Sequence, residues 1–135
     1  MRAILLASVA VFLITACHHP SDQTVDRDFQ HVFGIALPQH KKIQLSYRTL
    51  SDSHGDYGLY AVVSLSQEDY KHLNQAFVAL KIFDSKKYIE VISYPEVVPY
   101  FRRSAIAYER SITSCFGRCA FLPESNQIAF TIDYY

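Results

Sequence analysis

The 135-residue chain contains three cysteines and six histidines, residue types that act as nucleophiles and metal ligands. Cys17 stands directly before His18 and His19, a spacing that suggests a metal site. A zinc site needs three or four groups that converge on one point. The sequence around these three residues therefore favours a linker over a metal centre.

A second group of candidate ligands lies in the stretch SDSHGDYG, where Asp52, His54 and Asp56 alternate. These three side chains are weak candidates for a metal site, because a fourth ligand is missing. Serine, aspartate and glycine are also the residues that a polar hairpin loop requires. The sequence favours the loop, and we predict neither a metal nor a cofactor.

The remaining cysteines, Cys115 and Cys119, are separated by Phe-Gly-Arg. In an oxidising compartment two nearby thiols are expected to pair, and Gly117 allows a tight turn between them. A redox-active pair prefers two intervening residues and a helix start. The sequence therefore predicts a structural disulfide that pins a strand end or a hairpin tip.

The first residues form a leader of the secretory type. Met1-Arg2 is followed by twelve uncharged residues, Ala3 to Ile14. A helix needs about 20 apolar residues to span a bilayer, so this run fits the apolar part of a signal peptide instead.

The four residues Ile14 to Cys17, Ile-Thr-Ala-Cys, resemble the lipobox of bacterial lipoproteins. The resemblance covers residues 1–17 only, and isoleucine at the first position departs mildly from the usual leucine. It implies removal of residues 1–16, lipidation of Cys17, and a short tether at residues 17–21. A lipidated sulfur is a poor zinc ligand, and His18 in place of aspartate implies the periplasmic face of the outer membrane.

The rest of the chain, residues 22–135, is expected to form one α+β domain. Helical spacing predicts helices from Ser21 or Asp22 to Phe33 and from Ser66 to Leu80. Alternating patterns predict strands over 42–50, 59–66, 86–94, 105–112 and 126–135, with a turn, an irregular crossing or a short helix at 95–103. We expect an antiparallel sheet of about four to five strands with two helices on one face.

One segment carries residue types that are enriched in binding hot spots. Tyr100, Phe101, Arg102 and Arg103 follow Pro99 directly. A disulfide-stiffened tip would present two further residues of this kind, Phe116 and Arg118. These six residues are the candidate partner surface, although for the first four the sequence favours the simpler interpretation of one buried aromatic beside solvated arginines.

The overall composition limits the function classes. Thirteen basic and thirteen acidic residues balance, so the chain lacks the positive excess of a nucleic-acid-binding protein. No HExxH, GxSxG or glycine-rich phosphate loop is present.

We expect a non-enzymatic lipoprotein that contacts the membrane through its anchor and binds an envelope protein. The alternative is an immunity-type lipoprotein that inhibits a toxin in the periplasm, but the loss of Arg2 leaves twelve basic and thirteen acidic residues, which gives no strong charge for that role.

Overall fold

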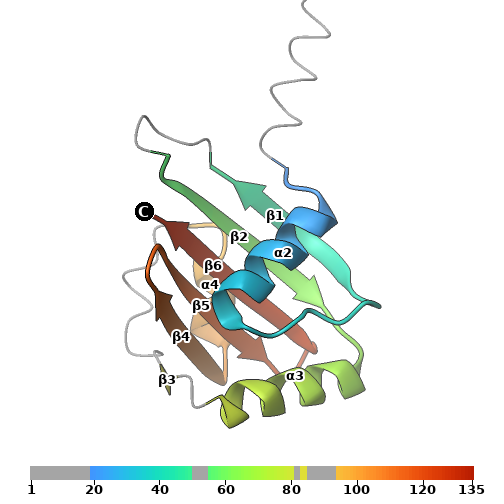
Figure 1. Cartoon of the computed structure of the whole chain (residues 1–135). Coiled ribbons are helices and arrows are strands. Elements are labelled where there is room, and N and C mark those ends of the chain that lie inside the picture. Colours follow the sequence, from blue (N-terminus) through green and yellow to red (C-terminus); the bar gives the residue numbers. More distant parts are fainter. Residues whose placement is uncertain (1–18, 50–54, 81–82, 85–93) are drawn as a thin grey trace, which may run out of the picture.

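The computed structural model describes residues 19–49, 55–80, 83–84 and 94–135. They form an α+β fold around one antiparallel sheet with the strand order β1-β2-β6-β5-β4-β3 (Figure 1). The elements are α2 (Asp22–Phe33), β1 (Lys42–Arg48), β2 (Tyr57–Ser64), α3 (Gln67–Ala79), β3 (Phe83–Asp84), α4 (Val98–Arg103), β4 (Ile106–Ile112), β5 (Cys115–Leu122) and β6 (Gln127–Tyr134). The predicted fold class is confirmed, with five long strands, the two-residue β3, and two helices on one face.

Helix α2 forms where the sequence supplies both of its end signals. The Ser21 hydroxyl accepts a hydrogen bond from the Thr24 amide, and Gly34 ends the helix in the left-handed region at φ 71°. The Gly34 amide donates to the Gln30 carbonyl at 2.8 Å. These contacts satisfy backbone groups that a helix end would otherwise leave without partners.

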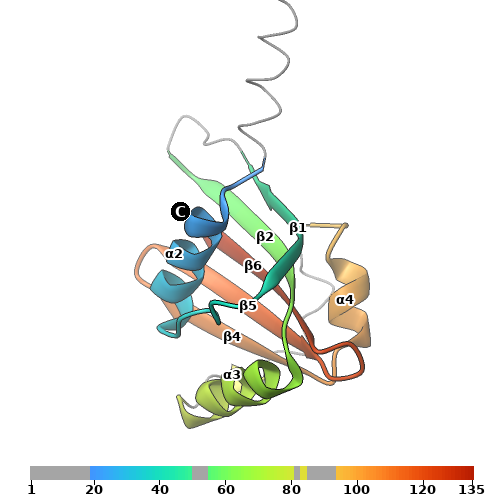
Figure 2. The ribbon, with the colours of Figure 1, turned by 90° about the vertical axis from the view of Figure 1, so that its right-hand side faces the viewer.

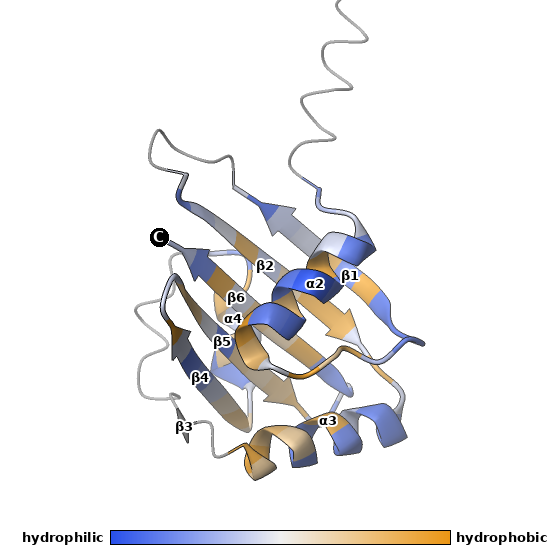
Figure 3. Cartoon of the chain, viewed as in Figure 1, coloured by the Kyte–Doolittle hydropathy of each residue, from blue (hydrophilic) through white to orange (hydrophobic). Residues whose placement is uncertain are grey.

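Helix α3 is built in a similar way, with Ser66 as its N-cap. The Ser66 hydroxyl accepts a hydrogen bond from the Asp69 amide at 3.0 Å. Leu73 and Phe77 are buried against the sheet, whereas Leu80 is exposed beyond the end of the helix. In Figure 3 the outward side of α2 is mostly hydrophilic, whereas α3 is hydrophilic at its start and hydrophobic at its end, where Val78 is exposed.

The two sides of the sheet are covered by different helices. Figure 2 shows α2 and α3 on one side and α4 on the other, which we call the α2/α3 face and the α4 face. Side chains alternate between the two faces along each strand. In β6, for example, Ile128, Phe130 and Ile132 pack beneath α2 and α3, whereas Ala129 packs beneath α4.

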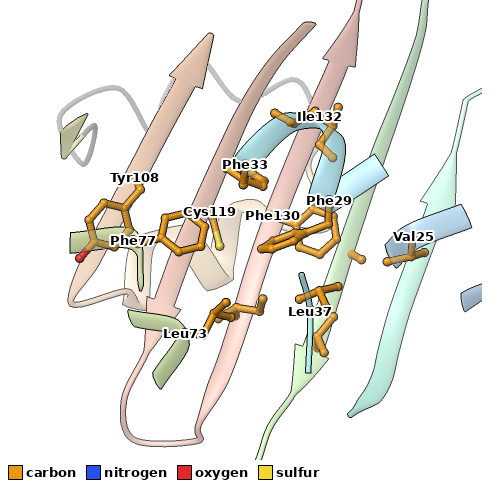
Figure 4. Packing of buried hydrophobic residues seen from close by; sticks show 14 of the residues in the cluster. Val25, Phe29, Phe33, Leu37, Leu73, Phe77, Tyr108, Cys119, Phe130 and Ile132 are labelled. Atoms are coloured by element: carbon orange, nitrogen blue, oxygen red, sulfur yellow. The ribbon is translucent and has the colours of Figure 1, made fainter. Parts of the chain in front are cut away.

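The α2/α3 face holds the larger core, which is dominated by phenylalanine rings (Figure 4). Phe77 lies at the centre of this group, with ring centroids 5.3 Å from Phe33, 5.1 Å from Tyr108 and 5.3 Å from Phe121. Phe29 packs edge-on against Phe130 at 4.9 Å. Tilted and edge-on contacts of this kind are favourable beyond the area that they bury.

The α4 face has a smaller core because the strands beneath α4 carry small side chains. Val97 and Phe101 pack over three alanines, Ala107, Ala120 and Ala129. Small residues let the short helix approach the sheet closely, so that Phe101 is only 1% exposed. This helix is one of the three structures that the sequence left open for residues 95–103.

The structure bears in different ways on a predicted strand and on membrane-spanning helices. The strand predicted at 86–94 lies outside the described residues except for Tyr94, which is not in a strand. Within the described part of the chain, none of the helices combines the length and the apolar character needed to cross a membrane.

Candidate functional site

The candidate partner surface separates into three groups in the structure. Phe101 belongs to the core beneath α4, so its prediction as a surface residue is wrong. The reason is the helical turn itself, which directs Phe101 toward the sheet while Arg102 and Arg103 point to solvent.

Phe116 and Arg118 lie in β5, not at a hairpin tip. The Arg118 guanidinium carbon lies 4.8 Å from the centre of the Phe116 ring, and Nε lies 3.5 Å from Oε2 of Glu109 on the neighbouring strand. The Arg118 side chain is only 12% exposed. These two residues therefore interact with each other and with the sheet, and they offer little free surface.

The outer side of α4 keeps the exposed part of the candidate partner surface. Tyr100 is half-buried, and Arg102 and Arg103 are exposed. The Arg103 guanidinium carbon lies 5.1 Å from the centre of the Tyr100 ring, and Nε donates a hydrogen bond to the Pro99 carbonyl at 3.3 Å. The two contacts hold Arg103 against the helix and so reduce the entropy that it would lose on binding a partner.

A hollow of about 390 Å³ adjoins this end of α4. Arg103 and Ala105 line one side of it, and the turn between β5 and β6 lines the other through Leu122, Pro123, Glu124 and Ser125. Sequence reasoning missed these turn residues, although Pro123 marks a turn there. We call Tyr100, Arg102, Arg103 and the residues 122–125 the α4 site.

The α4 site is fixed to the sheet through Tyr94, which precedes the helix. The Tyr94 hydroxyl donates a hydrogen bond to Oδ1 of Asp133 in β6 at 2.5 Å, and its ring lies 5.2 Å from the ring of Tyr60. Burial, followed by the bond to Asp133, raises the pKa of Tyr94. The alternating pattern in the sequence placed Tyr94 at a strand end and gave no signal for this contact.

The predicted disulfide is wrong for this fold. Cys115 and Cys119 are both free and buried, and they lie in the same continuous strand, β5. Four steps of about 3.3 Å place their Cα atoms roughly 13 Å apart, beyond the range of about 7 Å that a disulfide bridges. Burial raises the pKa of both thiols, which disfavours the reactive thiolate.

The weak metal candidates are not brought together in the part of the chain that the structure describes. Asp52 and His54 lie outside the described residues, as do Cys17 and His18. Asp56 is half-buried beside β2, and the described residues hold no group of three or more His, Cys, Asp or Glu side chains suited to a metal.

Among the residues whose burial is described, the most buried carboxylate belongs to Asp28, on the inner side of α2. Its Oδ1 accepts two hydrogen bonds from the exposed Arg27 guanidinium, each at 3.1 Å. Burial first, and the nearby Asp28 charge second, raise the pKa of Cys115 and of Tyr134. This arrangement stabilises protonated neighbours and does not activate them.

Chemically, the α4 site places the Arg103 cation and the Glu124 carboxylate at the hollow. The half-buried Tyr100 ring and a second exposed cation, Arg102, lie on the same helix. Such a set offers charge and an aromatic ring for contact with another surface. Comparison of the chain with protein-family models, with curated proteins and with solved structures gives no match.

Proposed function

We propose that this chain is a small lipid-anchored protein of the bacterial envelope that binds another envelope protein through the α4 site, without catalysing a reaction. The anchor is proposed from the lipobox resemblance at Ile14–Cys17. The observation that carries the binding role is the hollow between Arg103 and the turn at 122–125, with the exposed Arg102 on the same helix.

Three features support a binding role at this place. Tyrosine and arginine are the residue types that most often dominate binding energy at interfaces. The buried Phe101 and the bond from Tyr94 to Asp133 hold α4 in position before a partner arrives. The turn between β5 and β6 lies at the end of the sheet away from the entry of the chain into α2 (Figure 2), so a tether at Cys17 leaves the hollow accessible.

The short tether restricts where such a partner is met. Helix α2 begins at Asp22, five residues after Cys17. Five residues reach at most about 18 Å when fully extended. An anchored domain would therefore stay close to the lipid surface, so the partner is proposed to be a protein of the same membrane or one that approaches it.

The test is site-specific photo-crosslinking in cells that express the full-length chain. A photoreactive amino acid in place of Arg102 is expected to capture a partner, and the same amino acid in place of Lys71 is the matched control. Lys71 is also an exposed cation, but it lies on α3, across the sheet from α4. Equal capture at both positions, or none at Arg102, would contradict the proposal.

The identity of the captured protein also separates the two binding roles. An envelope protein of the same cell supports the accessory role. A protein that reaches the periplasm only during attack by another cell would instead support the immunity-type alternative.

The anchor has its own test, which does not depend on the partner. Full-length chain labelled with a palmitate analogue is expected to carry the label and to sediment with membranes. Cys17→Ala is expected to abolish the labelling and to leave the leader uncleaved. In the family that this segment resembles, the leader is removed only after the cysteine sulfur has been lipidated. An unlabelled, uncleaved parent chain would contradict the anchoring proposal.

A further inference from the structure

Strand β1 forms one edge of the sheet, and among the described strands it pairs with β2 alone. Outward backbone groups of an edge strand are free to pair with another strand. The direction of these groups follows from one hydrogen bond, since the Thr49 amide donates to the Gly58 carbonyl of the neighbouring strand at 2.8 Å. In antiparallel pairs the residues alternate, so Tyr47 also faces β2, whereas Ser46 and Arg48 direct their backbone groups outward.

A second contact supports this direction independently. Nδ1 of His19 lies 3.3 Å from the Ser46 carbonyl oxygen, on the outer side of β1. Beside it, a groove of about 260 Å³ runs along the strand and is lined by His19, Asp22 and the residues 43–46. A single exposed side chain therefore covers the outward carbonyl at the centre of the edge.

The edge is short because the strand is interrupted. The register between β1 and β2 shifts between Ile43 and Leu45, which marks a bulge at Gln44. A bulge twists an edge and limits pairing to a few residues. Only the stretch from Leu45 to Thr49 has regular geometry for an added strand.

This stretch is self-complementary about Ser46. In an antiparallel pair of two copies centred there, Ser46 faces Ser46. The outward N–H of each Ser46 then donates a hydrogen bond to the C=O of the other. Leu45 of one copy faces Tyr47 of the other, and both side chains are half-buried at the margin of the α4-face core. Arg48 faces the neutral Gln44, so no like charges are brought together.

We propose that the outer edge of β1 is a homodimer interface, at which residues 45–47 of two copies pair antiparallel about a two-fold axis at Ser46. Closed two-fold dimers are the commonest symmetric assemblies, and an isologous contact uses the same patch on both chains. The bulge at Gln44 keeps the pairing short, and the dimer leaves the α4 site free on each copy.

The test uses Ser46→Cys in the full-length chain, oxidised in intact cells. At the two-fold axis the two Cα atoms would lie about 5.5 Å apart, within the range of a disulfide. A disulfide-linked species of twice the chain mass is expected on a non-reducing gel. Ser111→Cys, at an exposed position of β4, is the matched control and is expected to stay monomeric, as is the parent chain, whose Cys115 and Cys119 are buried.

Two further variants act in opposite directions on the mass of the purified chain, measured by light scattering. Ser46→Pro is expected to abolish the dimer without unfolding the domain, because it removes an N–H that does not bond to β2. His19→Ala is expected to increase the dimer fraction, because it frees the Ser46 carbonyl. A parent chain that stays monomeric at its highest soluble concentration, together with no disulfide-linked dimer of the Ser46→Cys variant, would overturn the proposal. Crosslinking of that variant only to a different protein would overturn it as well.

Discussion

The two faces of the sheet are built from the same strands but are covered in different ways. On the α2/α3 face, two helices with serine N-caps bury a group of phenylalanine rings. On the α4 face, a six-residue helix without a side-chain N-cap lies over alanines and is surrounded by tyrosines. The first face is the main source of stability, and the second exposes the residues that we assign to binding.

The comparison shows that phenylalanine and tyrosine suit different places in the fold. Phenylalanine has no polar atom to satisfy, so it suits a sealed core. Tyrosine needs a partner for its hydroxyl, and Tyr94 finds one in Asp133 at the margin of the α4 face. A margin of this kind remains accessible to another protein, whereas the core beneath α2 and α3 does not.

The largest expected effect comes from the phenylalanine core. Phe77→Ala is predicted to lower the free energy of unfolding by about 3–5 kcal/mol, because the cavity would be lined by rings that cannot close it. Phe101→Ala is predicted to cost less, near the lower end of that range, since the short α4 can settle onto the alanines below. Urea unfolding measures both values, and equal losses would show that the α4 face is as rigidly packed as the other.

The glycines of the two faces provide a second, smaller comparison. A Cβ at Gly117 would lie 2.5 Å from Cγ1 of Val32 and 2.8 Å from Cζ of Phe33. Gly117→Ala must therefore displace α2, and we predict a loss of about 1–3 kcal/mol, as for other overpacked cores.

The corresponding change on the α4 face is Gly58→Ala, whose Cβ would collide with the hydroxyl of Tyr94. The tip of a tyrosine can swing away, so the predicted loss is that of one hydrogen bond, about 1 kcal/mol. Tyr94→Phe removes the hydroxyl alone and is the matched control. If Gly58→Ala costs much more than Tyr94→Phe, the strand itself has been disturbed and the comparison fails.

The α2/α3 face could be predicted from the sequence, because its signals are local. Ser21, Gly34 and Ser66 mark helix ends, and apolar side chains recur at helical spacing between them. The strands β1, β2, β4 and β6 were also predicted from their alternating pattern.

The parts that could not be predicted depend on contacts between distant residues. The hydrogen bond between Tyr94 and Asp133 joins positions 39 residues apart. Strand β5 was hidden by its two cysteines, which suggested a bridged loop, although Cys115 and Cys119 alternate into the core as small apolar residues do. The hollow of the α4 site arises only where the end of α4 meets the turn between β5 and β6.

A third prediction concerns the caps that distinguish the helices of the two faces. Ser66→Ala removes the acceptor for the Asp69 amide and is predicted to lower the stability by about 1 kcal/mol. Ser125→Ala, at an exposed turn position, is the control and should stay within about 0.5 kcal/mol of the parent chain. Thermal or urea unfolding tests both variants, and an unchanged stability of Ser66→Ala would show that packing alone positions α3.

The smallest predicted effect compares one tyrosine from each face at alkaline pH. Burial raises the pKa of Tyr70, on α3, from 10.0 to about 12, and burial together with the bond to Asp133 raises the pKa of Tyr94. As the pH rises above 10, the unfolded chain releases these protons while the native chain retains them, so the stability must fall.

Tyr70→Phe removes the titrating hydroxyl, so this variant is predicted to lose less stability than the parent chain between pH 10 and pH 12. This interval lies between the pKa of Tyr70 in the unfolded chain, 10.0, and its pKa in the folded chain, about 12. Tyr94→Phe should show the same reduced slope but begin from a lower stability near neutral pH, because it also lacks the bond to Asp133. Urea unfolding at a series of pH values, with tyrosinate absorbance as the monitor of ionisation, measures both slopes. Parallel pH profiles for the parent and both variants would show that neither hydroxyl is held protonated by the fold, and the distinction between a sealed face and a marginal one would then need another physical basis.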